Sequence, residues 1–256
     1  MGNSLDSYES LEYDQMSFKT GDLILFSGQG GMSRLIKCAT FSPWSHVGIV
    51  LRIPDSSRFK WEGKGKNREN LYLFHSYNKE FEIDVISGEM KEGVQLNVLR
   101  DAIETYRKNG GRAFLRTAPR SFEDSVPKKK FMDWMIYSSH KQYEKSYYNL
   151  ASSQVDCCCL PCFRNTGDNS SYFCSELVRD ALSRLGDEKL RLCLGEYPDE
   201  FTPVDLSSGA YGFLCEPKVD LTELKWGEEV EIITNQKRRM KKKSPSAQNM
   251  LLKFEE

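Results

Sequence analysis

A cysteine and a histidine that lie far apart in the chain each have surroundings suited to nucleophilic catalysis. Cys174 stands in segment 172–178 (YFCSELV), where apolar residues at helical spacing predict an amphipathic helix over 174–185. His46 stands at the start of segment 46–50 (HVGIV), which predicts a strand over 46–53. A thiol at a helix N-terminus beside an imidazole favours the thiolate, which is the reactive form. This pair predicts a cysteine nucleophile with a histidine base.

The residues before Cys174 predict how its thiol is activated. Asn169, Ser170 and Ser171 are typical N-cap residues, so we expect the helix to begin at the cysteine. The helix N-terminus and a nearby imidazolium lower a thiol pKa below its usual value of about 8.5. The backbone N–H groups of the same turn suit the oxyanion of an acyl-transfer intermediate.

A third polar group should orient the imidazole of His46 through its second ring nitrogen. The chain has three histidines, and the other two are His75 and His140. His75 lies on a predicted strand over 71–76, next to the histidine strand, and is the candidate. The residues alone leave a simpler interpretation open, in which Cys174 is a small buried residue of its helix and the histidines are structural.

The apolar patterns predict short strands and helices in mixed order. Alternation over 46–53 separates two faces: the first carries Val47, Ile49, Leu51 and Ile53, the second His46, Gly48 and Val50. Segment 28–31 (GQGG) lacks the Lys-Ser or Lys-Thr of a phosphate loop and is interpreted as a hinge at the rim of the site. The other predicted strands are 23–26, 71–76, 94–98 and 112–117, and the other predicted helices are 32–40, 101–108 and 127–143.

Five segments in this order resemble the circularly permuted branch of the NlpC-type papain-like proteins, which includes the bacterial YiiX proteins and their poxvirus relatives. In that branch the histidine strand precedes the cysteine helix, the reverse of the order in papain, and the order here is the same. The resemblance covers about residues 20–185. Its segments are 21–26 (GDLILF), 45–50 (SHVGIV), 71–76 (LYLFHS), 93–96 (GVQL) and 172–178 (YFCSELV).

The resemblance implies an α+β, circularly permuted papain-like fold with an antiparallel sheet packed on the helix that bears the nucleophile. It implies Cys174 as nucleophile and His46 as base. The family's third polar residue, often glutamate, falls on the next strand, where this chain has His75; Glu62 in the preceding loop is a less favoured substitute. The implied reaction is attack of the thiolate on a carbonyl to give an acyl-enzyme, so no metal or organic cofactor is expected.

The rest of the sequence predicts appendages to one domain. We expect a flexible leader over 1–17, the papain-like domain over 18–233 with a Cys-rich loop insertion over 149–171, and a basic disordered tail over 234–256. The tail contains KRRMKKK at 237–243, a composition that suits anionic lipid, nuclear import or simple solvation.

Two segments are candidates for lipidation. Gly2 is placed as N-myristoylation requires, although Asp6 stands where Ser or Thr is usual. Two lipid signals together would give peripheral membrane contact, while the alternatives are a frayed terminus and a partly buried loop beside the groove. A second group of zinc ligands is not visible, so a zinc site is not expected. The cysteines that suit S-palmitoylation are Cys157, Cys158, Cys159 and Cys162.

Composition argues against several classes of protein. The formal net charge is -1 at pH 7, so nucleic-acid binding gains no support. No segment approaches the roughly 18 apolar residues of a membrane helix, and the N-terminus has no signal-peptide core. Four of the eight cysteines fall within 157–162, which does not suit a disulfide framework and favours a cytoplasmic compartment, with or without membrane association.

The sequence therefore predicts a thiol-dependent hydrolase or acyltransferase that acts on an amide, ester or thioester of a peptide or lipid acyl donor. Two alternatives stay open. One is a catalytically inactive module that binds a peptide or lipid in the same groove. The other is a lipid-anchored membrane adaptor.

Overall fold

The computed structural model describes residues 5–40, 42–54, 70–78, 81–119, 122, 129–143, 171–194, 201–208, 221 and 224–234. Within these residues the chain is a mixed α+β protein with a mostly antiparallel sheet. Several predicted features lie outside the described residues: Gly2, Glu62, Asn169, Ser170, the cysteines at 157–162, and the basic tail beyond Thr234.

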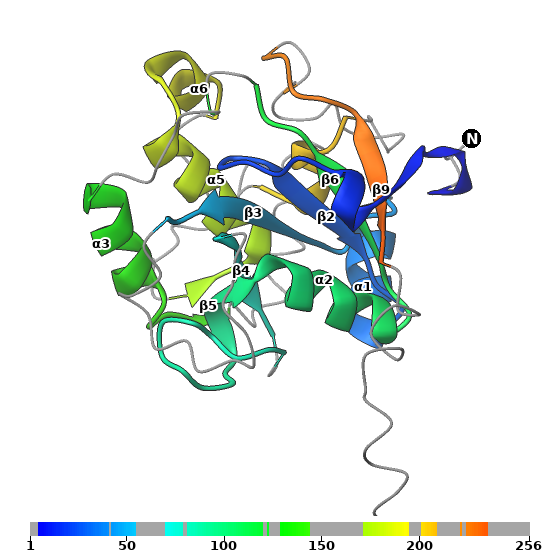
Figure 1. Ribbon diagram of the computed structural model, residues 1–256, viewed down its shortest axis with the longest axis horizontal. Coiled ribbons are helices and arrows are strands. Elements are labelled where there is room, and N and C mark those ends of the chain that lie inside the picture. Colours follow the sequence, from blue (N-terminus) through cyan, green and yellow to red (C-terminus); the bar gives the residue numbers. More distant parts are fainter. Residues whose placement is uncertain are drawn as a thin grey trace, which may run out of the picture.

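One seven-stranded sheet crosses the molecule in the order β1-β9-β6-β2-β3-β4-β5 (Figure 1). Neighbouring strands are antiparallel, except that β1 and β9 are parallel. The strands are β1 (Ser10–Glu12), β2 (Leu23–Ser27), β3 (His46–Arg52), β4 (Leu71–Tyr77), β5 (Gly93–Val98), β6 (Arg112–Arg116) and β9 (Glu229–Ile233). A separate parallel pair consists of β7 (Gln142–Tyr143) and β8 (Ser171–Tyr172).

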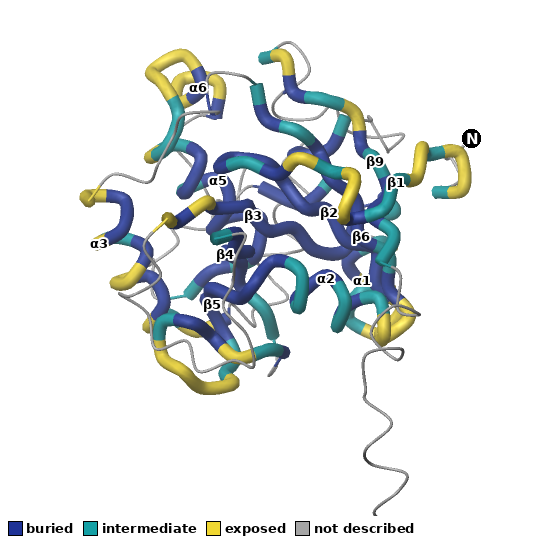
Figure 2. The backbone as a smooth tube through the Cα atoms, viewed as in Figure 1, coloured by how far each residue is buried: buried dark blue, intermediate teal, exposed yellow. Residues whose placement is uncertain are grey.

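Helices pack on both faces of this sheet. α5 (Cys174–Leu185) packs on β3 and β4, and α2 (Leu99–Lys108) packs on the opposite face. The strands between them form the buried centre of the molecule (Figure 2). The remaining helices are α1 (Gly31–Ala39), α3 (Lys129–Ser138) and α6 (Glu188–Cys193), and the 3-10 turns are η1 (Leu5–Ser7), η2 (Tyr13–Gln15) and η6 (Pro203–Leu206).

The predicted alternation along β3 is confirmed. Val47, Ile49 and Leu51 belong to the core that contains α5, whereas Val50 belongs to the core that contains α2. His46 shares the side of Val50 by the same alternation, because successive strand residues point to opposite faces. The cysteine helix and the histidine side chains therefore lie on opposite faces of the sheet, and they can meet only at the end of β3.

Residues 5–17 differ from the predicted flexible leader. Ser10–Glu12 form β1 at the edge of the sheet, and Tyr13 is buried against Phe18 with the ring centroids 4.7 Å apart. Arg112 of β6 also donates to Asp6 Oδ1 at 2.8 Å. These contacts join residues that are far apart in the sequence, so a local pattern does not reveal them.

α3 is also shorter than the predicted helix over 127–143. It ends at Ser138, and Tyr143 then pairs with Tyr172 in the small β7–β8 sheet.

Among all the described residues, no helix has the length and apolar content needed to cross a bilayer.

Candidate active site

Cys174 is the first residue of α5 and is 3% exposed. The predicted start of the helix at the cysteine is confirmed, although the expected cap is different. Phe173 occupies the N-cap position, Ser171 belongs to β8, and the carboxylate of Glu176 accepts the Phe173 N–H at 2.8 Å. The first turn is thus closed by a glutamate three residues into the helix rather than by a serine before it.

The thiol of Cys174 lies where β3 begins. Burial raises the pKa of Cys174 to about 12, while the backbone N–H groups of Val47, Ser175 and Cys174 itself act to lower it. The contact with Val47 places the sulfur beside the residue that follows His46. The predicted lowering of the thiol pKa is therefore wrong for this conformation, because desolvation of a buried thiolate outweighs the helix N-terminus.

Three polar side chains form a chain of hydrogen bonds across β3, β4 and β5. His46 Nε2 lies 2.9 Å from His75 Nδ1, and His75 Nε2 lies 2.6 Å from Asn97 Oδ1. All three residues are buried. The structure thus brings His75 to His46, as expected, and adds Asn97 behind it.

The direction of these hydrogen bonds follows from Asn97. Its Nδ2 donates to the backbone carbonyls of Glu82 and Ile83, at 3.3 and 3.0 Å, so its Oδ1 must face His75. His75 therefore donates from Nε2, and when neutral it accepts at Nδ1. His46 must then donate from Nε2, which leaves its lone pair on Nδ1. The network fixes one tautomer of His46, with Nδ1 as the basic atom.

Burial keeps both imidazoles neutral. It lowers the pKa of His46 well below its ordinary value of 6.5, and the proximity of His75 lowers that pKa further. Burial also lowers the pKa of His75 to about 4, against the opposing effects of the hydrogen bond to Asn97 and the charge of Asp84. The resting site therefore contains a neutral thiol and neutral imidazoles. A thiolate–imidazolium pair is unfavourable while these side chains are buried from water.

Gly48 makes room for this network. A Cβ at Gly48 would lie 3.1 Å from the Cβ of His75 and 2.6 Å from Leu73 Cδ1. The neighbouring strands can approach there only because Gly48 has no side chain. The glycine of the segment HVGIV thus has a direct steric role in placing His75.

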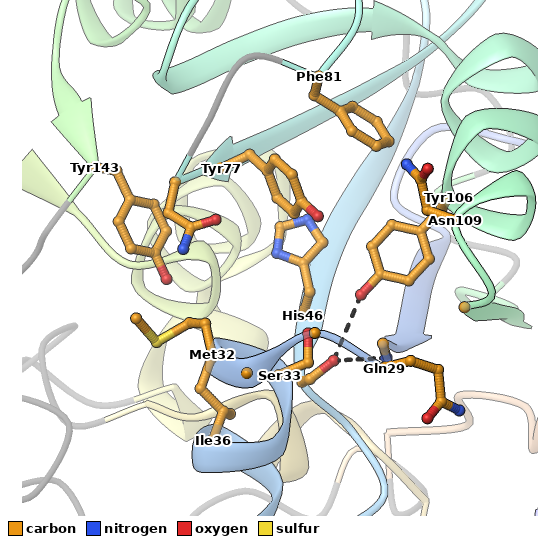
Figure 3. A pocket seen from close by; sticks show the side chains of 16 residues that line it. Gln29, Met32, Ser33, Ile36, His46, Tyr77, Phe81, Tyr106, Asn109 and Tyr143 are labelled. Atoms are coloured by element: carbon orange, nitrogen blue, oxygen red, sulfur yellow. Dashed lines mark hydrogen bonds between the residues drawn. The ribbon is translucent and has the colours of Figure 1, made fainter.

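A cavity of about 360 Å3 opens beside His46 (Figure 3). The ring of His46 lies 5.1 Å from that of Tyr77 and 6.4 Å from that of Tyr106, between centroids. The Ser45 hydroxyl accepts the Gly28 N–H at 2.9 Å and lies 3.4 Å from the Tyr106 hydroxyl. Further walls come from the start of α1 and from Phe81, Asn109 and Tyr143.

Cys174 lies behind this wall. Its charge raises the pKa of Tyr77 and of Tyr143, second in each case to burial of the phenol. The thiol therefore lies near two of the side chains that line the cavity.

The structure brings Cys174, His46 and His75 to one end of β3 and leaves His140 exposed, outside the hydrogen-bond network. The sequence analysis did not predict Asn97 or the three tyrosines of the cavity, Tyr77, Tyr106 and Tyr143. For Asn97 there is a signal, because it alternates with Val94, Leu96 and Val98 on a predicted strand and so must point away from their apolar face.

Among the described residues, no three His, Cys, Asp or Glu side chains are grouped to hold a metal ion.

Comparison with protein-family models finds no match, and comparison with curated proteins finds none either. Among solved structures, the chain is similar to the metalloprotein YiiX from Escherichia coli O157:H7, at 15% sequence identity and a TM-score of 0.36. The aligned part covers 65% of this chain and 66% of YiiX, so the chain spans slightly less than two thirds of that protein. The similarity is a distant one.

Proposed function

We propose that the chain is a thiol-dependent hydrolase or acyltransferase with a circularly permuted papain-like fold. The observation that carries this proposal is the Asn97–His75–His46 hydrogen-bond chain, which leaves Nδ1 of His46 as the free basic atom. The order of the elements supports it, because the histidine strand β3 precedes the cysteine helix α5. A buried imidazole held in one tautomer near a thiol is the arrangement that nucleophilic catalysis by cysteine requires.

In the proposed reaction, the thiol proton of Cys174 moves to Nδ1 of His46 as Sγ bonds to the carbonyl carbon of the acyl donor. The imidazolium returns this proton to the leaving group as the bond between that group and the carbonyl carbon breaks. A thioester remains on Cys174. Water then releases the acid, or an amine or alcohol takes the acyl group, and His46 accepts and returns the proton in this second half. His75 and Asn97 act as positioning residues throughout.

The proposed substrate is a peptide or lipid acyl donor. Peripheral membrane contact through acylation of Gly2 and of Cys157, Cys158, Cys159 and Cys162 is part of the same proposal and rests on the sequence. Metabolic labelling with alkynyl myristate and alkynyl palmitate, followed by peptide mapping, would test it. Incorporation of neither label would remove membrane anchoring by lipid from the proposal.

The test of catalysis is formation of a covalent acyl-enzyme. The full chain is incubated with short-chain thioester, ester and peptide-ester donors, and the adduct is mapped by mass spectrometry. We expect a thioester on Cys174, none in Cys174→Ala, and a rate at least about a hundredfold lower in His46→Ala. Cys193→Ala is the matched control, because Cys193 is an exposed free cysteine on α6. Equal adduct formation in wild type and His46→Ala would overturn the proposal.

A specific observation favours a second function, that of a non-catalytic binding module. Burial opposes both charges of a thiolate–imidazolium pair in the present conformation. A module of this kind would bind its ligand in the cavity beside His46 equally well in wild type and Cys174→Ala, without a covalent adduct. The adduct experiment therefore separates the two functions.

A further inference from the structure

The N-terminus of α1 opens into the cavity beside His46. Gly30 is its N-cap residue and provides no side-chain cap, and α1 runs for nine residues from Gly31. Gly30, Gly31, Met32 and Ser33 all line the cavity. The first N–H groups of a helix have no partner within the helix and are normally satisfied by a capping side chain or by a ligand. Here they face a space large enough for a ligand.

A buried phenol points into the same cavity from another element. Tyr143 of β7 lines the cavity and is 7% exposed, and its hydroxyl has no hydrogen-bond partner among the described residues. Figure 3 shows this hydroxyl directed toward the side of the cavity formed by α1. This oxygen is not one of the enclosed polar atoms that lack a partner, so it is accessible from the cavity and its donor is available to a bound group.

The described residues that line the cavity include no Asp, Glu, Lys or Arg. The carboxylate of Glu176, whose charge acts on Tyr143, does not line it and accepts the Phe173 N–H. Among these residues a cation would therefore find no counter-charge, whereas an anion would find N–H and O–H donors and the positive end of a helix.

We propose that this cavity binds the phosphate group of the substrate, held by the first N–H groups of α1 and by the hydroxyl of Tyr143. The inference rests on the proposed function, because it names the part of the acyl donor that does not react. Helix N-termini are established phosphate sites on electrostatic and geometric grounds. The segment 28–31 lacks the phosphate-loop pattern, so this site depends on the helix end and not on a Walker motif. The volume of about 360 Å3 exceeds the need of a phosphate alone, which leaves room for the group that it esterifies.

The sharpest test is Gly30→Asp. Gly30 has φ -67 and ψ 165, and a Cβ there would meet nothing within 4 Å, so any side chain fits. An aspartate at this position caps the helix with its own carboxylate, and it occupies the place of the anion. We expect folding to be retained with an equal or slightly higher Tm, while inorganic phosphate binding, titrated by calorimetry on the full chain, weakens at least about tenfold.

Two further variants separate charge from shape. Gly30→Asn caps the same N–H groups without a charge and should give a phosphate affinity between those of wild type and Gly30→Asp. Tyr143→Phe removes one donor and should weaken binding by about tenfold. Glycerol 3-phosphate and dihexanoyl phosphatidic acid are the second and third probes. Tighter binding of the lipid probe identifies a lipid headgroup as the source, and equal binding of all three identifies a small phosphate ester.

The inference is overturned if inorganic phosphate and both esters fail to saturate the wild type, or if Gly30→Asp binds them as well as wild type does. These titrations require no turnover, so they are independent of the acyl-enzyme experiment. An acyl-enzyme without phosphate binding leaves the proposed function in place, and phosphate binding without an acyl-enzyme favours the binding module.

Discussion

The Nε2 atom of His75 lies 2.6 Å from Oδ1 of Asn97, and this single contact determines the protonation pattern of two histidines. The Asn97 amide cannot rotate by half a turn, because its Nδ2 already donates to two backbone carbonyls. A rotated amide would also set two N–H groups against each other. Asn97 of β5, two strands away from β3, thus determines that the lone pair of the His46 ring lies on Nδ1.

Removal of Asn97 tests this dependence. Asn97→Ala should lower the rate of acyl-enzyme formation about a hundredfold, since a misplaced base commonly costs that much. It should also lower the free energy of unfolding by about 1–3 kcal/mol, because a buried N–H of His75 loses its acceptor. Rates from adduct formation and stability from urea unfolding are the two measurements. An unchanged rate in Asn97→Ala would show that His46 is not oriented through this network.

Asn97→Asp provides a different readout from a purely structural change. It keeps an acceptor for His75 and adds a negative charge, which stabilises an imidazolium at His46 and so raises the pKa of His46. The acid limb of the pH–rate profile should therefore move to higher pH than in wild type. A profile that falls in amplitude but keeps its position would mean that Asn97 serves only packing.

The thiol of Cys174 should be a slow nucleophile in the resting protein. Its raised pKa of about 12 keeps it protonated through neutral pH. Alkylation by iodoacetamide, followed by peptide mapping, should therefore be slow at Cys174 below about pH 9. Cys38 and Cys193, which are exposed free cysteines, are internal references and should react first. Faster alkylation of Cys174 than of both references at pH 6 would contradict the buried resting state.

A methyl group added at Gly48 of β3 should disturb the site by colliding with Leu73 and His75 on the neighbouring strand. Gly48→Ala brings its Cβ to 2.6 Å from Leu73 Cδ1 and 3.1 Å from the Cβ of His75, so we expect a loss of about 1–3 kcal/mol in unfolding free energy and slower adduct formation. Gly31→Ala is the matched stability control, because a Cβ there meets nothing within 4 Å. Thermal unfolding of the two variants measures the difference. Similar Tm values would mean that β3 and β4 can separate without cost.

Acid stability should depend on Glu231 of β9. Hydrogen bonds from Arg112 hold the pKa of this carboxyl below its usual 4.5, against the effect of burial. Its contribution to stability is therefore complete above that unfolded value and is lost as the pH falls through the lower folded pKa. Glu231→Gln should cost about 1 kcal/mol at pH 7 and progressively less in acid.

Asp14→Asn is the control for this effect. Asp14 pairs with Arg100, but its side chain is 60% exposed, so its loss should change unfolding free energy by less than about 0.5 kcal/mol at any pH. Denaturant unfolding between pH 3 and pH 7 distinguishes the two pairs. Parallel curves for Glu231→Gln and wild type would exclude the linkage.

The sequence predicts best where the decisive interactions are local. The alternation of β3 separates Val47 from His46 without any knowledge of the fold, and the apolar spacing after Cys174 gives α5 from its first residue. His75 could be selected because the chain has few histidines and its strand is adjacent. Asn97 has the same alternation signal, but a polar strand residue is not informative until its neighbours are known.

Other features depend on contacts between distant segments. The cavity joins the start of α1, the end of β4, α2 and β7, so the roles of Tyr77, Tyr106 and Tyr143 cannot be read from any one segment. The raised pKa of Cys174 also depends on contacts between distant segments. Position at a helix N-terminus can be predicted, but the degree of burial, which determines the sign of the shift, is a property of the assembled core.

The pairing of β1 with β9 affects how the protein is made. Ser10 Oγ donates to Glu231, a residue 221 positions later, and the two strands lie side by side at one edge of the sheet. At synthesis rates of 5–20 residues per second, about 10–45 s separate the appearance of these two strands on the ribosome. During that interval β1 remains an unpaired arm, and β6 is an open edge from its own synthesis until that of β9. A chaperone that binds exposed strands therefore has a defined period, between the synthesis of β1 and that of β9, in which to act on this chain.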